Sequence, residues 1–81
     1  MTKKVNEYQA AQAHAENFLC VTFMGQNARR READRSPLRD PDFRERFGKL
    51  PFTEIYEWAK WWYSAYDAES MRIVREHLKK N

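Results

Sequence analysis

Glycine, proline and cysteine are all scarce in this chain. It has two glycines, three prolines and one cysteine in 81 residues. Turns depend on glycine and proline, so their scarcity argues against a turn-rich β domain. Cys20 has no second cysteine to pair with, so no internal disulfide reinforces the small core, and a reducing, cytosolic setting is expected. Cys20 has apolar neighbours and is interpreted as a small buried hydrophobe.

Long hydrophobic runs are also absent. The longest, residues 18–24, has seven residues including Thr22, whereas a transmembrane helix needs roughly 20. The N-terminus carries Lys3 and Lys4 and then turns polar, so no signal peptide is expected. These features predict a soluble, cytoplasmic protein with no membrane partner.

Groups that carry catalysis or bind metals are few and scattered. The two histidines, His14 and His77, and the single cysteine have no close spacing, which argues against a zinc site. Gly25 and Gly48 stand alone, so there is no glycine-rich phosphate loop. Catalytic groups could still converge from distant positions, but a helical domain this small has little room for a closed pocket. We therefore expect no enzymatic activity, no cofactor, and no catalytic or metal-binding residue.

Residues that favour helices are abundant. The chain is rich in Ala, Glu, Arg, Lys and Gln, with 42% hydrophobic and 33% charged residues. Its length suits one domain. The sequence predicts an all-α fold, a small single-domain bundle of three to four helices over residues 1–81.

The first helix is expected at about residues 6–24. Asn6 is placed to cap its start, and Gly25 follows its last apolar turn, where a left-handed C-cap prefers glycine. At about 100° per residue, its apolar positions share one face. These positions are Tyr8, Ala11, Ala15, Phe18, Leu19 and Thr22.

A short second helix is expected at about residues 41–47. Asp40 is a good N-cap, and Pro41 suits the first helical position. Two phenylalanines four residues apart share a face and would plug the core, and Gly48 ends the helix.

The stretch after Pro51 predicts helices at about residues 52–65 and 68–79. Glu69 falls where the apolar stripe of the first of these helices would continue, and Asp67 is placed to cap a new helix. A single kinked helix over the whole stretch is the alternative.

Aromatic residues concentrate in the third helix. Seven of the twelve, including all three tryptophans, lie between Phe52 and Tyr66. The apolar arc of this helix covers about 220°, twice that of an ordinary surface helix. Either the helix is central and packed on both sides, or one shoulder is exposed and binds a partner. A homodimer would cover such a shoulder as well as a foreign protein. The candidate partner-binding aromatics are Tyr56, Trp58, Trp61 and Tyr63.

Basic residues concentrate in an arginine-rich connector predicted at about residues 26–40. Residues 29–39 carry five arginines and two carboxylates, which equals the whole net charge of +3. Arginine forks suit phosphates and carboxylates. The segment could contact nucleic acid, an acidic protein or only solvent, with local pairing to Glu32 and Asp34. The candidate residues are Arg29, Arg30, Arg31, Arg35 and Arg39.

These features favour binding over catalysis. The leading interpretation is a small non-enzymatic intracellular protein that docks on a larger macromolecule, preferably a protein, as an inhibitor, adaptor or assembly factor. Small charged domains of this kind are common among phage and mobile-element proteins that block host machinery, which is an association only. The alternative is a nucleic-acid-binding protein that contacts the phosphate backbone through the arginine-rich segment.

Overall fold

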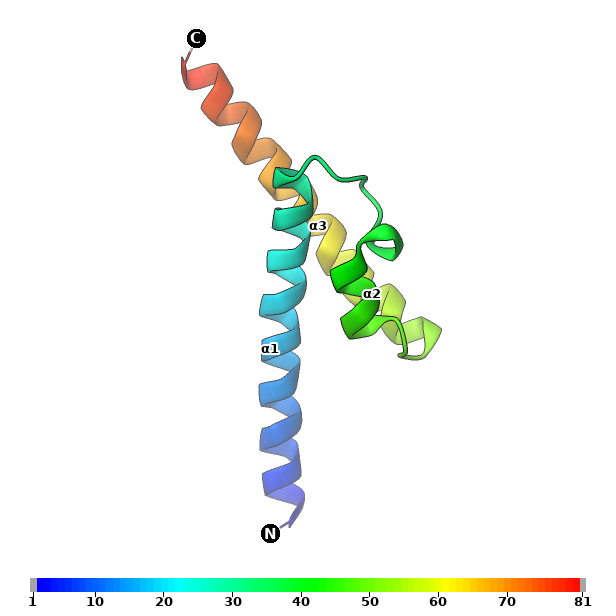
Figure 1. Ribbon diagram of the computed structural model, residues 1–81. Coiled ribbons are helices and arrows are strands. Elements are labelled where there is room, and N and C mark those ends of the chain that lie inside the picture. Colours follow the sequence, from blue (N-terminus) through cyan, green and yellow to red (C-terminus); the bar gives the residue numbers. More distant parts are fainter. Residues whose placement is uncertain (1, 81) are drawn as a thin grey trace.

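The chain forms two long helices that cross, with a short helix beside the crossing (Figure 1). The computed structural model describes the backbone of residues 2–80 and the side chains of residues 7–79. The elements are α1 (Thr2–Arg30), the 3-10 helix η1 (Pro37–Arg39), α2 (Pro41–Phe47) and α3 (Phe52–Lys80). No strand occurs between residues 2 and 80, so the predicted all-α class is confirmed.

α1 and α3 run in the same general direction. The His14 ring packs on Trp58, and further along both helices Arg29 bonds to Ser70. The helices cross at an angle, and α2 lies beside the first half of α3 (Figure 1). The molecule measures 59 × 24 × 16 Å. The first half of α1 and the last turns of α3 therefore extend beyond the core.

α2 lies where the sequence predicts it. Asp40 caps the helix by accepting a hydrogen bond from the backbone N–H of Asp42. Phe43 and Phe47 are both buried, with ring centroids 5.0 Å apart, which confirms the two-phenylalanine plug. Gly48 is the C-cap, although its φ of −65° is right-handed.

The predicted end of the first helix at Gly25 is wrong, because α1 continues past it. Gly25 is buried at the crossing with α3. A Cβ atom there would lie 2.5 Å from the carbonyl oxygen of Trp62 and 2.9 Å from the Cβ atom of Ala65. The glycine thus allows the two helices to approach closely. The predicted start is also wrong, since Asn6 lies inside α1.

α1 ends instead at a Schellman turn without glycine. Glu32 has a φ of 59° and is the one non-glycine residue with positive φ in the described chain. Its N–H donates to the carbonyl oxygen of Arg29 at 3.0 Å, and the Ala33 N–H donates to that of Ala28 at 2.9 Å. These two bonds define the Schellman motif, in which the left-handed position prefers glycine.

The face of α1 that packs is not the predicted one. The buried residues Val21, Gly25 and Ala28 lie about 100° around the helix from the predicted stripe. Tyr8 and Leu19, on that stripe, are 71% and 68% exposed. The residues buried at the helix crossing are small, whereas the apolar periodicity predicted that larger residues would be buried.

The helices predicted at 52–65 and 68–79 form one continuous helix, α3, as the alternative prediction had it. Glu69 interrupts the apolar stripe because it is a buried ion-pair residue. Its carboxylate lies 3.4 Å from the Arg30 guanidinium and also bonds to Arg72. The hydrogen bond from Arg72, aided by Arg30, lowers the pKa of Glu69.

Candidate functional site

The four aromatic residues predicted to bind a partner lie in different environments. The Trp58 ring is partly buried and stacks on Phe47 at 5.2 Å. Tyr63 is also partly buried. In contrast, Trp61 is 45% exposed and Tyr56 is 59% exposed. Part of the aromatic surface of α3 is therefore left uncovered by the rest of the described chain.

Trp62 is the centre of the core. It is fully buried, and its indole N–H donates to Asp40 Oδ2 at 2.8 Å. Its ring stacks on Tyr66, whose hydroxyl donates to the Ala33 carbonyl oxygen at 2.7 Å. Among the side chains of residues 7–79, every buried polar atom has a partner. Asp40 thus joins the start of α2 to α3, a role that its capping signal alone did not reveal.

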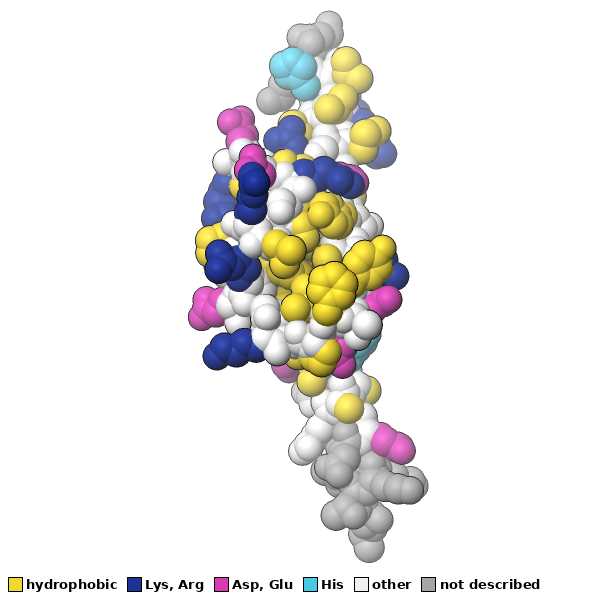
Figure 2. Space-filling model, turned by 90° about the vertical axis from the view of Figure 1, so that its right-hand side faces the viewer, with side chains coloured by type: hydrophobic (Ala, Val, Ile, Leu, Met, Phe, Trp, Pro, Cys, Tyr) yellow, Lys and Arg dark blue, Asp and Glu magenta, His cyan; other side chains and the backbone are white. Residues whose placement is uncertain are grey.

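The exposed aromatics on one side of α3 border an apolar hollow with η1, which we call the α3–η1 hollow. It has a volume of about 220 Å³. Phe52, Tyr56 and Leu38 are all more than half exposed around it. Figure 2 faces this side of the molecule and shows hydrophobic side chains gathered at its centre. The lining residues are Pro37, Leu38, Phe52, Ile55, Tyr56, Ala59, Lys60 and Tyr63.

Sequence reasoning found the two tyrosines of the hollow but missed Leu38 and Phe52 as site residues. Leu38 is far from α3 in sequence, and only the fold of η1 brings it there. Phe52 belongs to the aromatic cluster, but its position at the first residue of α3 leaves it 78% exposed.

Two cations lie over the tyrosine rings of the hollow. The Arg35 guanidinium is 4.6 Å from the Tyr63 ring centroid, and the Lys60 ammonium is 5.5 Å from that of Tyr56. Both distances are within the range of cation–π attraction. Both cations are also paired with carboxylates, Arg35 with Asp67 at 2.7 Å and Lys60 with Glu57 at 3.1 Å, so they give the rim of the hollow no net positive charge.

A wider depression of about 630 Å³ adjoins the hollow and shares Leu38 and Ile55 with it. Its charged lining residues are Arg44, Lys49 and Glu45. Two cations stand against one carboxylate, so the lining of this depression has a net positive charge.

The arginine-rich connector is shorter than predicted, because residues 26–30 belong to α1. Arg29 and Arg30, in the last turn of α1, both bind α3. The Nε atom of Arg29 donates to Ser70 Oγ at 2.8 Å, and Arg30 pairs with Glu69. These two arginines fasten the end of α1 to α3.

Arg35 fastens the connector to α3. Its guanidinium donates two hydrogen bonds to the Asp67 carboxylate, at 2.8 and 2.7 Å. This bidentate hydrogen bonding lowers the pKa of Asp67 and raises that of Arg35. Asp67 is therefore a salt-bridge partner inside α3, and its predicted role as a helix cap is wrong.

The other two arginines also have partners in the chain. Arg31 lies 3.8 Å from Asp40, and Arg39 lies 3.1 Å from Asp34. Of the two local carboxylates that the sequence suggested as partners, Asp34 alone forms an ion pair in the described chain. All five arginines are thus held by the chain's own groups, and they do not form a row of free guanidinium forks.

The described residues provide neither a candidate metal site nor a membrane-spanning helix. No group of three or more His, Cys, Asp or Glu side chains there could hold a metal ion. No helix in the described chain combines the length and the apolar character needed to cross a membrane.

Comparisons of the chain with protein-family models, with curated proteins and with solved structures yield no match.

Proposed function

We propose that this chain is a small non-enzymatic binding domain that docks on a larger protein through the α3–η1 hollow. One observation carries the proposal. Phe52, Tyr56 and Leu38 are exposed together around a concave apolar site, while the core is already complete around Trp62. These exposed side chains are not needed to complete the fold, and aromatic side chains supply much of the energy of protein interfaces.

The size of the hollow favours a protein over a small molecule. At about 220 Å³ it is smaller than the roughly 300–1,000 Å³ of typical ligand sites. The hollow has room for one anchoring side chain of a partner protein, and the surface around the hollow would make a flatter contact with that partner. Tyr56 is 59% exposed, so its hydroxyl can bond to the partner or to water.

The charges around the hollow indicate the chemistry of the partner. Arg44 and Lys49 outnumber Glu45 in the adjoining depression, whereas Lys60 on the rim is paired with Glu57. An apolar anchor flanked by carboxylates would complement this surface and bind in the right register. By covering a partner's surface in this way, the chain would act as an inhibitor, adaptor or assembly factor.

The test begins with co-purification of the tagged chain from its native host and mass spectrometry of what it retains. The dissociation constant of the purified partner is then measured by calorimetry. Leu38→Ala in the hollow is expected to raise it at least tenfold, about 1.4 kcal/mol. Leu78→Ala, a matched control at an exposed leucine near the end of α3, is expected to leave it within twofold. Equal effects of the two variants would contradict the proposal.

The alternative, nucleic-acid binding through the arginine-rich segment, needs guanidinium groups that can reach phosphates. The five arginines of that segment are all engaged within the chain. Nucleic-acid binding would give micromolar or tighter affinity for duplex or single-stranded oligonucleotides, and the logarithm of the affinity would fall linearly with the logarithm of the salt concentration. A salt titration measures this directly.

A further inference from the structure

α1 carries an apolar stripe that the described chain covers only in part, since Phe18 packs on Trp61 with ring centroids 4.9 Å apart. Tyr8, Leu19 and Phe23 are each at least 60% exposed. We call this stripe the α1 seam. It consists of Tyr8, Ala11, Ala15, Phe18, Leu19, Thr22 and Phe23. An isolated helical segment of this length is marginal in water, so packing against another surface would stabilise it.

The spacing of the seam is that of a coiled coil. Tyr8, Ala11, Ala15, Phe18 and Thr22 follow one another at intervals of three, four, three and four residues. This is the a/d pattern of a heptad repeat, which faces another helix along its length. The Thr22 hydroxyl donates to the Phe18 carbonyl oxygen at 2.9 Å, so it makes no demand on a partner.

The seam is almost without charge. Between Tyr8 and Ala28 the sequence contains one charged residue, Glu16, in a chain that is 33% charged. Two copies of such a surface meet without the like-charge repulsion that charged flanking positions would create. A charged partner, by contrast, would find no complementary groups along the seam.

We infer that two copies of this chain pair in antiparallel fashion through the α1 seam. One side of the second half of α1 packs on α3 and α2, so parallel pairing would crowd two cores side by side. Antiparallel pairing places the cores at opposite ends, as the projecting helix in Figure 1 allows. Ala11 and Ala15 then lie near the centre, where small side chains permit close approach of the helices.

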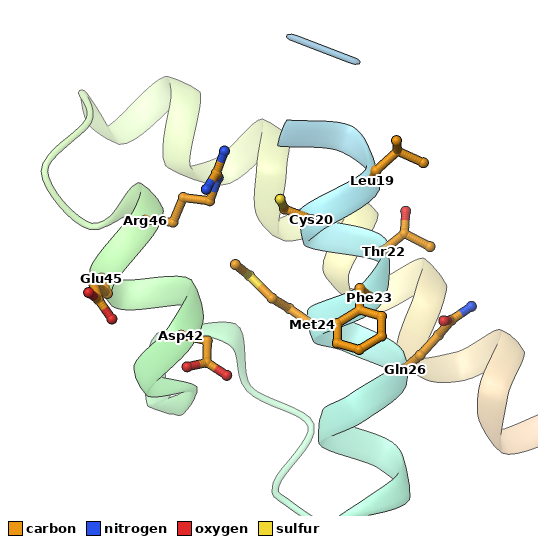
Figure 3. A pocket seen from close by; sticks show the side chains of 9 residues that line it. All are labelled: Leu19, Cys20, Thr22, Phe23, Met24, Gln26, Asp42, Glu45 and Arg46. Atoms are coloured by element: carbon orange, nitrogen blue, oxygen red, sulfur yellow. The ribbon is translucent and has the colours of Figure 1, made fainter. Parts of the chain in front are cut away.

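A groove beside Leu19 can receive Tyr8 of the partner helix. Pairing centred near residue 13 sets Tyr8 of one copy opposite Phe18 and Leu19 of the other. Leu19 borders an open groove of about 950 Å³ between α1 and α2, whereas Phe18 lies outside this groove and packs on Trp61 of α3. Figure 3 shows Cys20 and Met24 pointing from α1 toward α2, with Phe23 at the front. The flexible Met24 side chain can adapt to an inserted ring.

The contact area sets the expected strength. From Tyr8 to Phe23 the seam is about 22 Å long at 1.5 Å per residue, and it is about 10 Å wide. It covers a few hundred Å² on each copy, less than the roughly 800 Å² of a standard stable interface. The dimer is therefore expected to form in the micromolar range and to exchange readily. It uses a surface separate from the α3–η1 hollow, so its failure would leave the proposed function standing.

Sedimentation velocity of the full chain at 5–200 µM tests the dimer. The wild type should shift from monomer to dimer across this range. Ala11→Glu with Ala15→Glu should raise the dissociation constant at least tenfold, because four carboxylates meet near the centre. Ala13→Glu, on another face of the same exposed helix, should not change it. A monomeric wild type at 200 µM, or equal effects of the seam and control variants, would overturn the inference. Circular dichroism confirms that each variant is folded.

The orientation is tested with a spin label. In a Cys20→Ser background that retains the dimer, Gln26→Cys is labelled and the distance between copies is measured by pulsed electron resonance. Antiparallel pairing centred near residue 13 predicts about 40 Å, and parallel pairing about 10 Å. The shorter distance would exclude the proposed arrangement.

Discussion

Replacing Glu32 with glycine is expected to stabilise the protein. Glycine in the middle of a helix usually weakens it, because the unfolded chain gains freedom. Here, however, Glu32 occupies the left-handed position of a Schellman turn, with a φ of 59°. Its side chain is exposed and forms no ion pair in the described chain. The effect of the substitution on stability therefore depends on the backbone conformation alone.

The magnitude follows from two opposing terms. A residue with a Cβ atom loses roughly 1–2 kcal/mol in the left-handed region. Glycine avoids this cost but adds about 0.5–1 kcal/mol of conformational entropy to the unfolded state. The net gain for Glu32→Gly is about 0.5–1 kcal/mol, or about 2–8 °C in melting temperature for a domain of this size.

Urea and thermal denaturation followed by circular dichroism measure this gain. Glu32→Ala is the matched control, since it also removes the carboxylate but keeps the Cβ atom. It should leave the free energy of unfolding within about 0.5 kcal/mol of the wild type. If glycine proved no more stable than alanine at this position, α1 would not end in the left-handed turn described above.

Three further predictions concern the core and its ion pairs. Gly25→Ala should lower the free energy of unfolding by about 1–3 kcal/mol in urea melts through overpacking at the crossing, whereas an uncrowded helical glycine would gain about 1 kcal/mol with alanine. Trp62→Phe should lower it by at least about 1–3 kcal/mol, because Asp40 loses its buried indole donor; an unchanged melt would contradict that bond. Arginine partners lower the pKa values of Glu69 and Asp67 in the folded state. As the pH falls, these carboxylates are therefore protonated in the unfolded state before they are protonated in the folded state. Their contribution to stability should be complete near neutral pH and lost as the pH falls below about 4. A Glu69→Gln, Asp67→Asn double variant should show a smaller acid-induced fall in melting temperature than the wild type.

Local signals predicted some elements well. The start of α2 depends on Asp40 and Pro41, and both act within one helical turn of their own positions. Such signals can be recognised in the sequence because the interactions they indicate are local.

Features set by contacts between distant segments could not be predicted in the same way. Gly25 looked like a helix end, but its role depends on the backbone of α3 crossing beside it. Glu69 looked like a helix break, but Arg30 arrives from the other long helix to pair with it. In both cases the prediction used the neighbours of the residue in sequence, whereas a contact with a distant segment of the chain determines its role.

The candidate site shows the same division. The excess of aromatic residues on α3 was visible in the sequence, and Tyr56 and Trp61 do remain partly uncovered. The sequence did not show which side of α3 forms a concave site, because only the fold of η1 brings Leu38 to α3. The arginines were visible as a cluster, but their partners Asp67 and Glu69 lie more than thirty residues away along the chain.

The central claim is that the exposed aromatic side of α3 binds a protein while Trp62 holds the fold. Its most direct test is a calorimetric titration of the co-purified partner with the Phe52→Ala, Tyr56→Ala double variant. The account predicts that the dissociation constant rises more than tenfold while the free energy of unfolding stays within about 0.5 kcal/mol of the wild type. Binding as tight as that of the wild type, by a variant that remains folded, would contradict it.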